Sequence, residues 1–88
     1  MFQVTDRIRM KRNLRKIDTY GISPSIIKEH RKTIFWVRKV SEYVGEEGAI
    51  RIYKYAKVYD KKLKKYVNTI IDFDLAYLNP DMFEKVEV

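Results

Sequence analysis

The segment Gly21–Gly45, GISPSIIKEHRKTIFWVRKVSEYVG, carries the signals that decide the predicted fold. Ser23 can cap the first turn of a helix, and Pro24 suits the first helical position. Gly45 can adopt the left-handed conformation that commonly ends a helix. Together these signals predict a long central helix over residues 24–44.

The hydrophobic pattern of this segment agrees with a helix. At about 100° per residue, seven side chains fall within an arc of about 140°, which is wide enough to face a core. They are Ile26, Ile27, His30, Ile34, Val37, Val40 and Val44. The opposite side carries Lys28, Arg31, Lys32, Phe35, Arg38 and Lys39. A rival interpretation makes Thr33–Val37 a strand, because β-branched and aromatic residues suit a pleated sheet.

The segment Arg7–Lys16, which precedes this region, holds six basic residues in ten. We predict a basic helix over residues 5–19, because its apolar side chains then share a narrow face. These are Met10, Leu14 and Ile17. A strand interrupted by Arg12 is a second interpretation, and a basic arm that orders only on a partner is a third.

Residues Ile17–His30, IDTYGISPSIIKEH, resemble the turn and early recognition helix of helix-turn-helix DNA-binding proteins. In that family a glycine turn precedes an apolar residue, a serine cap and an apolar pair. The matching positions are Gly21, Ile22, Ser23, Ile26 and Ile27, whereas Ile17 stands where the family usually has a small residue. The resemblance implies a second helix that enters the major groove of DNA. It implies groove contacts from Ser25, Lys28, Glu29, Arg31 and Lys32.

Beyond Gly48 the apolar period changes to two, and residues 49–75 are predicted to form a β-hairpin. A loop at residues 61–64, KKLK, places Asp60 opposite Lys65. In that register both arms turn their apolar side chains to one face. Ile50, Ile52, Ala56 and Val58 then lie opposite Leu75, Phe73, Thr69 and Val67, with Lys54 the misfit opposite Ile71. The other face pairs Tyr59 with Tyr66, Lys57 with Asn68, Tyr55 with Ile70, Tyr53 with Asp72 and Arg51 with Asp74.

The predicted fold class is therefore α+β, in a single domain over residues 1–88. Two N-terminal helices, the second of them long, would pack on the antiparallel β-hairpin, whose apolar face would cover the helix. Asn79-Pro80-Asp81 predicts a short helical turn from Pro80 to about Lys85, within the acidic C-terminal segment 76–88. The order of elements is similar to a winged helix with residues 61–65 as the wing, which is an analogy of fold alone.

The net charge of +7 is unevenly placed along the chain. Residues 1–65 carry 18 of the 19 basic side chains and 7 acidic ones, whereas residues 66–88 carry 1 basic and 5 acidic side chains. This asymmetry favours a body that faces a polyanion, and a surface charged only for solubility is the alternative. No apolar run approaches the roughly 20 residues of a membrane span, so we expect a cytoplasmic protein with no membrane partner. The abundance of Lys, Glu, Ile and Tyr suits a thermophile.

The residues available for catalysis are few. The chain has no cysteine, which excludes disulfides and thiolate metal sites, and His30 is its one histidine. Asp72 and Asp74 would lie on one sheet face, where they could hold Mg²⁺, but their basic and phenolic neighbours favour charge pairing. No glycine-rich phosphate loop is present. We therefore expect neither enzymatic activity nor a metal or cofactor.

Basic residues neutralise phosphates, and aromatic rings stack on unpaired bases. We predict a small basic nucleic-acid-binding protein, with duplex DNA favoured, RNA as an alternative, and transcriptional regulation as the suggested role. The expected contact residues are Arg12, Arg15, Lys28, Arg31, Lys32, Phe35, Lys39, Tyr53, Tyr55, Lys57, Lys61, Lys62, Lys64 and Lys65. A protein-interaction module that uses the Tyr-rich sheet face, a homodimer, and a binder of single-stranded nucleic acid remain the alternatives.

Overall fold

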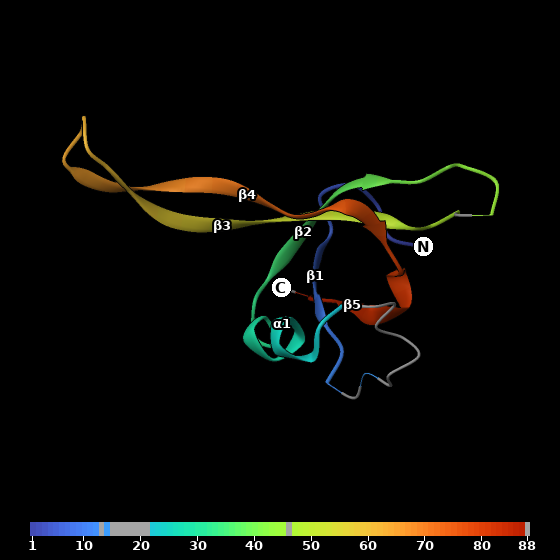
Figure 1. Ribbon diagram of the computed structural model, residues 1–88. Coiled ribbons are helices and arrows are strands. Elements are labelled where there is room, and N and C mark those ends of the chain that lie inside the picture. The colour runs from blue at the N-terminus through green and yellow to red at the C-terminus, as the bar shows by residue number, and fades with distance from the viewer. Residues whose placement is uncertain (13, 15–21, 46, 88) are drawn as a thin grey trace.

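The fold is one antiparallel sheet with a single short α-helix in the part of the chain that the structure describes. The computed structural model describes residues 1–12, 14, 22–45 and 47–87, with the backbone alone described at 74–76. Five strands lie in the order β4-β3-β2-β1-β5 (Figure 1). They are β1 (Arg7–Met10), β2 (Phe35–Val40), β3 (Ile50–Asp60), β4 (Lys65–Leu78) and β5 (Phe83–Lys85). The helix α1 spans Pro24–Glu29, and a 3₁₀ turn, η2, spans Pro80–Met82.

The predicted central helix over residues 24–44 is wrong beyond its first two turns. Ser23 and Pro24 do start α1, but the helix closes at His30, whose backbone N–H donates to the carbonyl oxygen of Ile26. The chain then enters β2, so the rival interpretation of this region as a strand is the correct one. In β2 the side chains alternate: Phe35 and Val37 are buried, while Trp36 is directed to the other face. Strand pairing on both sides of β2 satisfies its backbone groups, which outweighs the helical spacing.

The predicted helix over residues 5–19 is also wrong where the structure describes it. Residues Arg7–Met10 form β1, whose Ile8 and Met10 are fully buried and whose arginines face outward. Residue 13 and residues 15–19 of that prediction lie outside the described residues. The α+β arrangement of two N-terminal helices on a hairpin is therefore contradicted. So are the helix-turn-helix and winged-helix interpretations, because a strand replaces the first helix and the second helix has only six residues.

The predicted hairpin is confirmed over most of its length. β3 and β4 pair in the expected register from Asp60–Lys65 to Ile52–Phe73. Asp60 closes the loop, since its Oδ1 accepts from the backbone N–H groups of Lys62 and Leu63 at 2.8 and 3.1 Å. The register shifts between Ile50 and Ile52, so Ile50 pairs with Leu78 instead of the expected Leu75.

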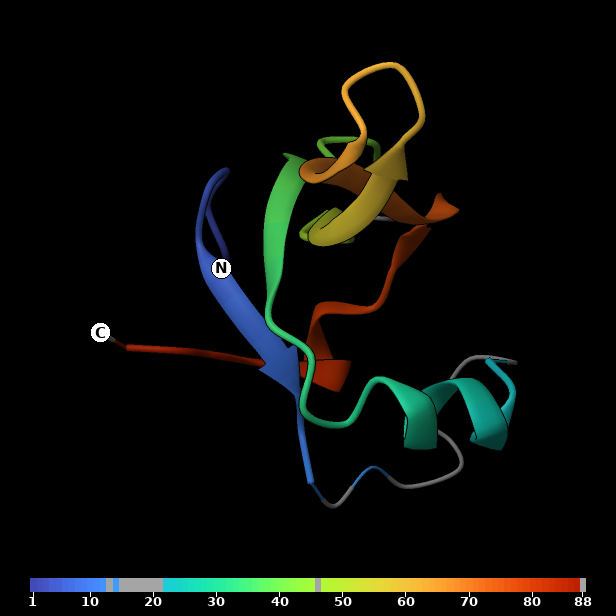
Figure 2. The same cartoon turned by 90° about the vertical axis from the view of Figure 1, so that its left-hand side faces the viewer.

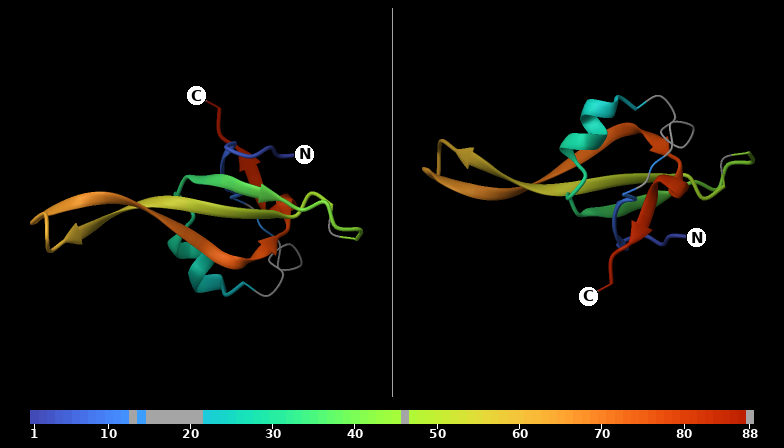
Figure 3. Two further views of the ribbon diagram at one scale, coloured as in Figure 1. Left: turned by 90° about the horizontal axis from the view of Figure 1, so that it is seen from above. Right: turned by 90° about the horizontal axis from the view of Figure 1, so that it is seen from below.

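The core lies on one face of the sheet, toward α1. Its buried members are Ile8, Met10, Phe35, Val37, Ile50, Ile52, Leu78, Met82 and Phe83. These residues come from all five strands and η2, and α1 adds the half-buried Ile27 at their edge. The distal part of the β3–β4 hairpin extends past this core (Figure 1), which gives the molecule extents of 46 × 27 × 27 Å. Figure 3 shows the same hairpin from above and below, and Figure 1 shows α1 beneath the sheet.

The acidic C-terminal segment contributes to the core instead of forming a tail. The predicted helical turn from Pro80 to about Lys85 is confirmed at its start as η2, where Asn79 Oδ1 accepts from the backbone N–H of Asp81 at 3.0 Å. It is wrong from Phe83 to Lys85, which form β5. The turn buries Met82 and leads into β5, which pairs with β1 and was not predicted. Gly45 does adopt a positive φ of 85°, but it lies in the β2–β3 connection and not at a helix end. Among the helices of the described ranges, none is long and apolar enough to cross a membrane.

Candidate nucleic-acid interface

Three aromatic rings contact one another on the sheet face opposite the core. Trp36 of β2 lies beside Tyr53 of β3, and alternation places Tyr55 on the same face. The rings of Trp36 and Tyr53 are stacked, with centroids 6.1 Å apart and an interplanar angle of 21°. Tyr55 meets Trp36 edge-on at 4.9 Å and Tyr53 at 5.8 Å. We call Trp36, Tyr53 and Tyr55 the aromatic cluster, and the sheet face that carries it the outer face.

The aromatic cluster is held in place and remains accessible. Trp36 and Tyr53 are half-buried, and the Tyr55 side chain is 49% exposed. Rings that pack on one another lose little further freedom when a ligand stacks on them, which lowers the entropic cost of binding. The outer face therefore presents an ordered aromatic surface.

Arg38 joins the cluster through an irregularity in β2. The pairing of β2 with β3 shifts between Val37 and Lys39, and Arg38 is the residue at this shift. Its guanidinium carbon lies 5.2 Å from the Tyr53 ring centroid. Its Nε donates to Asp72 Oδ1 at 2.7 Å, and Asp72 is the cross-strand neighbour of Tyr53. The ion pair neutralises a carboxylate that would otherwise repel an anionic ligand at this face.

Asp72 therefore has the charge-pairing environment that the sequence favoured over a metal site. Within the described part of the chain, no group of three His, Cys, Asp or Glu residues could hold a metal ion. The side chain of Asp74 lies outside what the structure describes.

Further cationic residues surround the aromatic cluster. Arg7 on β1 is paired with Trp36, and Arg51 on β3 is paired with Lys39. The Nε atoms of Arg7 and Arg51 are buried without a hydrogen-bond partner among the described residues. Buried donors of this kind favour an acceptor nearby, because an unsatisfied polar group is costly. The aromatic cluster is thus bordered by positive charge on β1 and on β3.

The outer face continues along the projecting hairpin. Tyr59 and Tyr66 are cross-strand partners, with ring centroids 5.3 Å apart, and are 50% and 68% exposed. Lys57 lies between Tyr55 and Tyr59 on the same face and is exposed. The hairpin tip adds the exposed Lys61, Lys62, Lys64 and Lys65. Aromatic and basic side chains therefore alternate from the cluster to the tip.

The phenol of Tyr53 should titrate at a higher pH than an ordinary tyrosine. Burial, and to a smaller extent the neighbouring Tyr55, raises the pKa of its phenol above the ordinary 10.0, while Arg38 opposes part of the shift. Because the folded chain binds this proton more tightly, the stability it contributes is complete below about pH 10 and is lost as the pH rises through the folded pKa. An ultraviolet titration of tyrosinate should lose a component with a pKa above the ordinary 10.0 in Tyr53→Phe. Retention of that component would contradict the assignment.

The predicted contact residues fall into separate groups. Tyr53, Tyr55 and Lys57 lie on the outer face, Lys39 borders it, and Lys61, Lys62, Lys64 and Lys65 form the hairpin tip. Arg12, Lys28, Arg31 and Lys32 gather elsewhere, around a basic cleft beside α1. Arg15 lies outside the described residues.

Phe35 does not have the outward position that the helical prediction gave it. It is fully buried, and its ring packs 5.0 Å from Phe73 and 6.4 Å from Phe83. A ring at the centre of the core is not available to stack on a base, so Phe35 is removed from the candidate interface. Its neighbour Trp36 takes the outward position because β2 is a strand.

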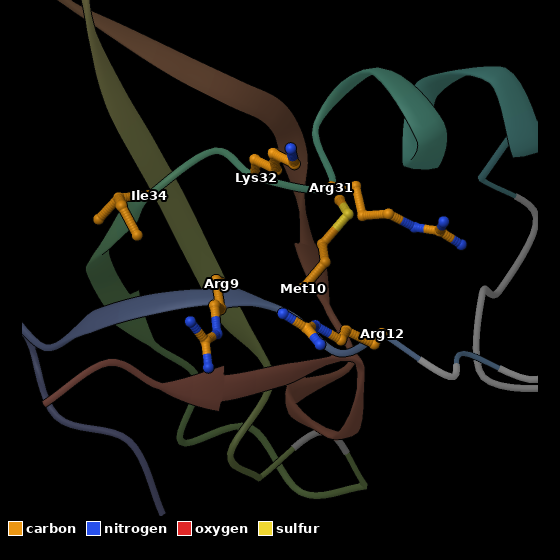
Figure 4. Close-up of a pocket in the computed structure, with 6 residues that line it drawn as sticks. All are labelled: Arg9, Met10, Arg12, Arg31, Lys32 and Ile34. Carbon is orange, nitrogen blue, oxygen red and sulfur yellow. The ribbon is translucent and has the colours of Figure 1, made fainter.

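One hollow of the basic cleft is lined by Arg9, Met10, Arg12, Arg31, Lys32 and Ile34 (Figure 4). Met10 lies between β1 and the segment that joins α1 to β2, with Arg9 and Arg12 on one side of it and Arg31 and Lys32 on the other. Sequence reasoning missed Arg7, Arg9 and Arg38. The alternation of Arg7 and Arg9 with Ile8 and Met10 was a usable signal, but the irregularity that directs Arg38 has no signal in the sequence.

His30, which was predicted to pack, lies half-buried at the end of α1. Its ring is 5.0 Å from that of Phe73, and its Nδ1 lies 3.0 Å from the carbonyl oxygen of Ile26. Its Nε2 faces the Lys54 ammonium at 3.4 Å. This contact gives Lys54, the misfit of the hairpin's apolar face, a polar partner. His30 thus links the end of α1 to the core-facing side of the β3–β4 hairpin.

Comparisons with protein-family models, with curated proteins and with solved structures find no match for this chain. The geometry of the outer face and of the basic cleft is therefore what indicates the function.

Proposed function

We propose that this protein binds single-stranded nucleic acid on its outer face, with bases stacked on the aromatic cluster. The observation that carries the proposal is the mutual packing of Trp36, Tyr53 and Tyr55 on an open sheet face. Arg38 beside the rings and Lys57 beyond them are placed to hold phosphates. The net charge of +7 adds long-range attraction for a polyanion.

Single strands fit this surface better than a duplex. Stacking of one base on an aromatic side chain is worth about 1–3 kcal/mol, and it needs a base that is not already stacked on its neighbours. Bases in a duplex are covered on both faces and offer only their edges. Base edges in the major groove are read by hydrogen-bonding side chains on a helix or a β-ribbon. The helix α1 has only six residues, and the packed rings on the β3–β4 ribbon offer stacking surfaces instead. The surface is suited to RNA or single-stranded DNA without strong sequence preference.

The test uses Trp36, the only tryptophan of the chain, as an internal reporter. Oligo(U), oligo(dT) and duplex DNA, each of about 12 nucleotides, are titrated at roughly 50 and 200 mM salt. We expect both single strands to quench Trp36 fluorescence and to bind more tightly than the duplex, with affinity that falls as salt rises. Binding of the duplex at equal or higher affinity, or binding without quenching, would contradict the proposal.

A protein-interaction role is the second candidate, and the projecting hairpin favours it. Apolar side chains are exposed on both of its faces, including Val58 at 44%, Ile70 at 48% and Ile71 at 38%. Such a surface suits a protein partner or a homodimer. The mass of the protein, measured in the same buffers with and without oligonucleotide, separates the two roles. A stable dimer that leaves Trp36 unaffected by every nucleic acid would favour the second.

A further inference from the structure

The basic cleft is the second concentration of positive charge in the fold. Three adjoining hollows meet there, and Arg12 lines all three. Their cationic residues are Arg9, Lys11, Arg12, Lys28, Arg31 and Lys32. They come from the end of β1, from α1 and from the segment between α1 and β2, which are brought together by the pairing of β1 with β2.

Little negative charge opposes these cations. Among the described residues that line the hollows, Glu84 is the one acidic group. Its Oε1 accepts from Arg9 Nε at 2.8 Å, so its charge is already paired. Met10 and Ile34 give the cleft an apolar floor. An apolar floor ringed by guanidinium and ammonium groups suits phosphates that are carried on an apolar or aromatic body.

The cleft is continuous with the outer face. β1 and β2 are antiparallel, with Arg7 beside Trp36, so the next outward positions are Arg9 on β1 and Ile34 just before β2. Two residues along a strand span about 7 Å. Figure 2 shows β1 and β2 side by side, with α1 at the foot of β2. A strand of nucleic acid that leaves the aromatic cluster along β2 therefore enters the basic cleft.

We propose that the basic cleft is a phosphate-binding subsite for the nucleic acid whose bases stack on the aromatic cluster. The inference rests on the proposed function and adds the path of the strand: from Tyr55, over Trp36, to Arg12 and Arg31, away from the hairpin tip. Arg12 is the central residue of the subsite, because it borders every hollow. The cleft holds backbone phosphates and does not select the sequence.

The first experiment compares two double variants that remove the same charge. The cleft variant, Arg12→Gln with Arg31→Gln, removes two cations from the cleft. The tip variant, Lys61→Gln with Lys62→Gln, removes two cations from the hairpin tip. All four residues are exposed. With an oligonucleotide of about 12 residues, we expect the cleft variant to lose roughly tenfold or more in affinity at low salt and to lower the salt slope by about one per phosphate contact. With an oligonucleotide of about 4 residues, which the aromatic cluster can hold alone, it should bind as the wild type does.

Two results would overturn the subsite. One is an equal loss of oligonucleotide affinity in the tip variant, which would mean that the cleft contributes only general positive charge. The other is an equal loss for the short oligonucleotide, which would mean that the cleft is not a separate position along the strand. Thermal melting of both variants shows whether the fold is retained.

A second arm separates this inference from the proposed function. Inorganic triphosphate is titrated into the wild-type protein and followed by backbone amide NMR shifts. We expect shifts at residues 9–12 and 31–34 and none at Tyr53 or Tyr55. If triphosphate binds there while single strands fail to quench Trp36, the cleft stands and the stacking function fails. If single strands quench Trp36 and triphosphate shifts nothing in the cleft, the function stands and the subsite fails.

Discussion

Replacing Phe35 by alanine should lower the free energy of unfolding by about 3–5 kcal/mol, the largest effect expected of a single substitution in this chain. Phe35 is fully buried, and its ring contacts His30, Phe73 and Phe83. Its loss leaves a cavity between the C-cap of α1 and the side chains of β4 and β5. A domain of this size has a total stability of roughly 4–13 kcal/mol, so the variant should be largely destabilised. Urea unfolding followed by circular dichroism measures the change.

Val44→Ala is the matched control, because the predicted helix gave it the opposite role. It belonged to the apolar stripe of residues 24–44, but in the structure it is 95% exposed. We expect a change within about 0.5 kcal/mol. If Val44→Ala were the costly substitution and Phe35→Ala the mild one, the strand assignment of β2 would be refuted and the long helix restored.

Replacing Tyr55 by alanine should weaken binding of single-stranded oligonucleotides about 5- to 150-fold, which corresponds to the 1–3 kcal/mol of one stacked base. Tyr55 is the most exposed ring of the aromatic cluster, at 49%, so its removal should disturb the fold least. The salt slope should stay unchanged, because a ring makes no ion pair with phosphate. This combination distinguishes Tyr55→Ala from the cleft variant, in which the slope falls. Quenching of Trp36 provides the measurement.

Two further variants sharpen this prediction. Tyr55→Phe keeps the ring and should retain most of the affinity. Tyr43→Ala removes a tyrosine that is 67% exposed in the β2–β3 connection, away from the cluster, and should leave affinity unaltered. An equal loss in Tyr43→Ala, or no loss in Tyr55→Ala, would remove stacking on the cluster from the mechanism.

Local signals in the sequence predicted the parts of this fold that are local. The register of β3 with β4 follows from a short loop and a strict alternation, and it is correct from Ile52 to Asp60. The turns at Ser23 and Asn79 follow from capping side chains, and both start where expected. Tyr53, Tyr55 and Lys57 were placed on one face for the same reason.

The errors arose where two periodicities overlap or where pairing is distant in sequence. Ile26 and Ile27 do belong to a helix that His30 caps, and Ile34, Val37 and Val40 continued its spacing by coincidence. β-branched and aromatic residues at 33–37 were the competing signal, and pairing with β1 and β3 made it decisive. β5 has three residues and pairs with a strand some 75 positions earlier, so no local pattern could reveal it.

The basic cleft was predictable in its residues but not in its assembly. Arg12, Lys28, Arg31 and Lys32 were all selected for their charge. Their meeting depends on β1 lying beside β2, which the prediction of two helices excluded. Of the aromatic cluster, only Tyr53 and Tyr55 were predicted to lie together. Trp36 joins them only when β2 is a strand.

The pairing of β1 with β5 has a consequence for the order of folding. The β3–β4 hairpin joins residues that are near in sequence and can form within microseconds. The contact of Met10 with Phe83 closes a far longer loop and must wait for η2 to place Met82 and Phe83 against β1. Tyr53 and Tyr55 can therefore be ordered on the hairpin early, whereas the aromatic cluster is complete only when β2 has paired with β3. Docking of β5 on β1 should therefore limit the rate at which the complete fold forms.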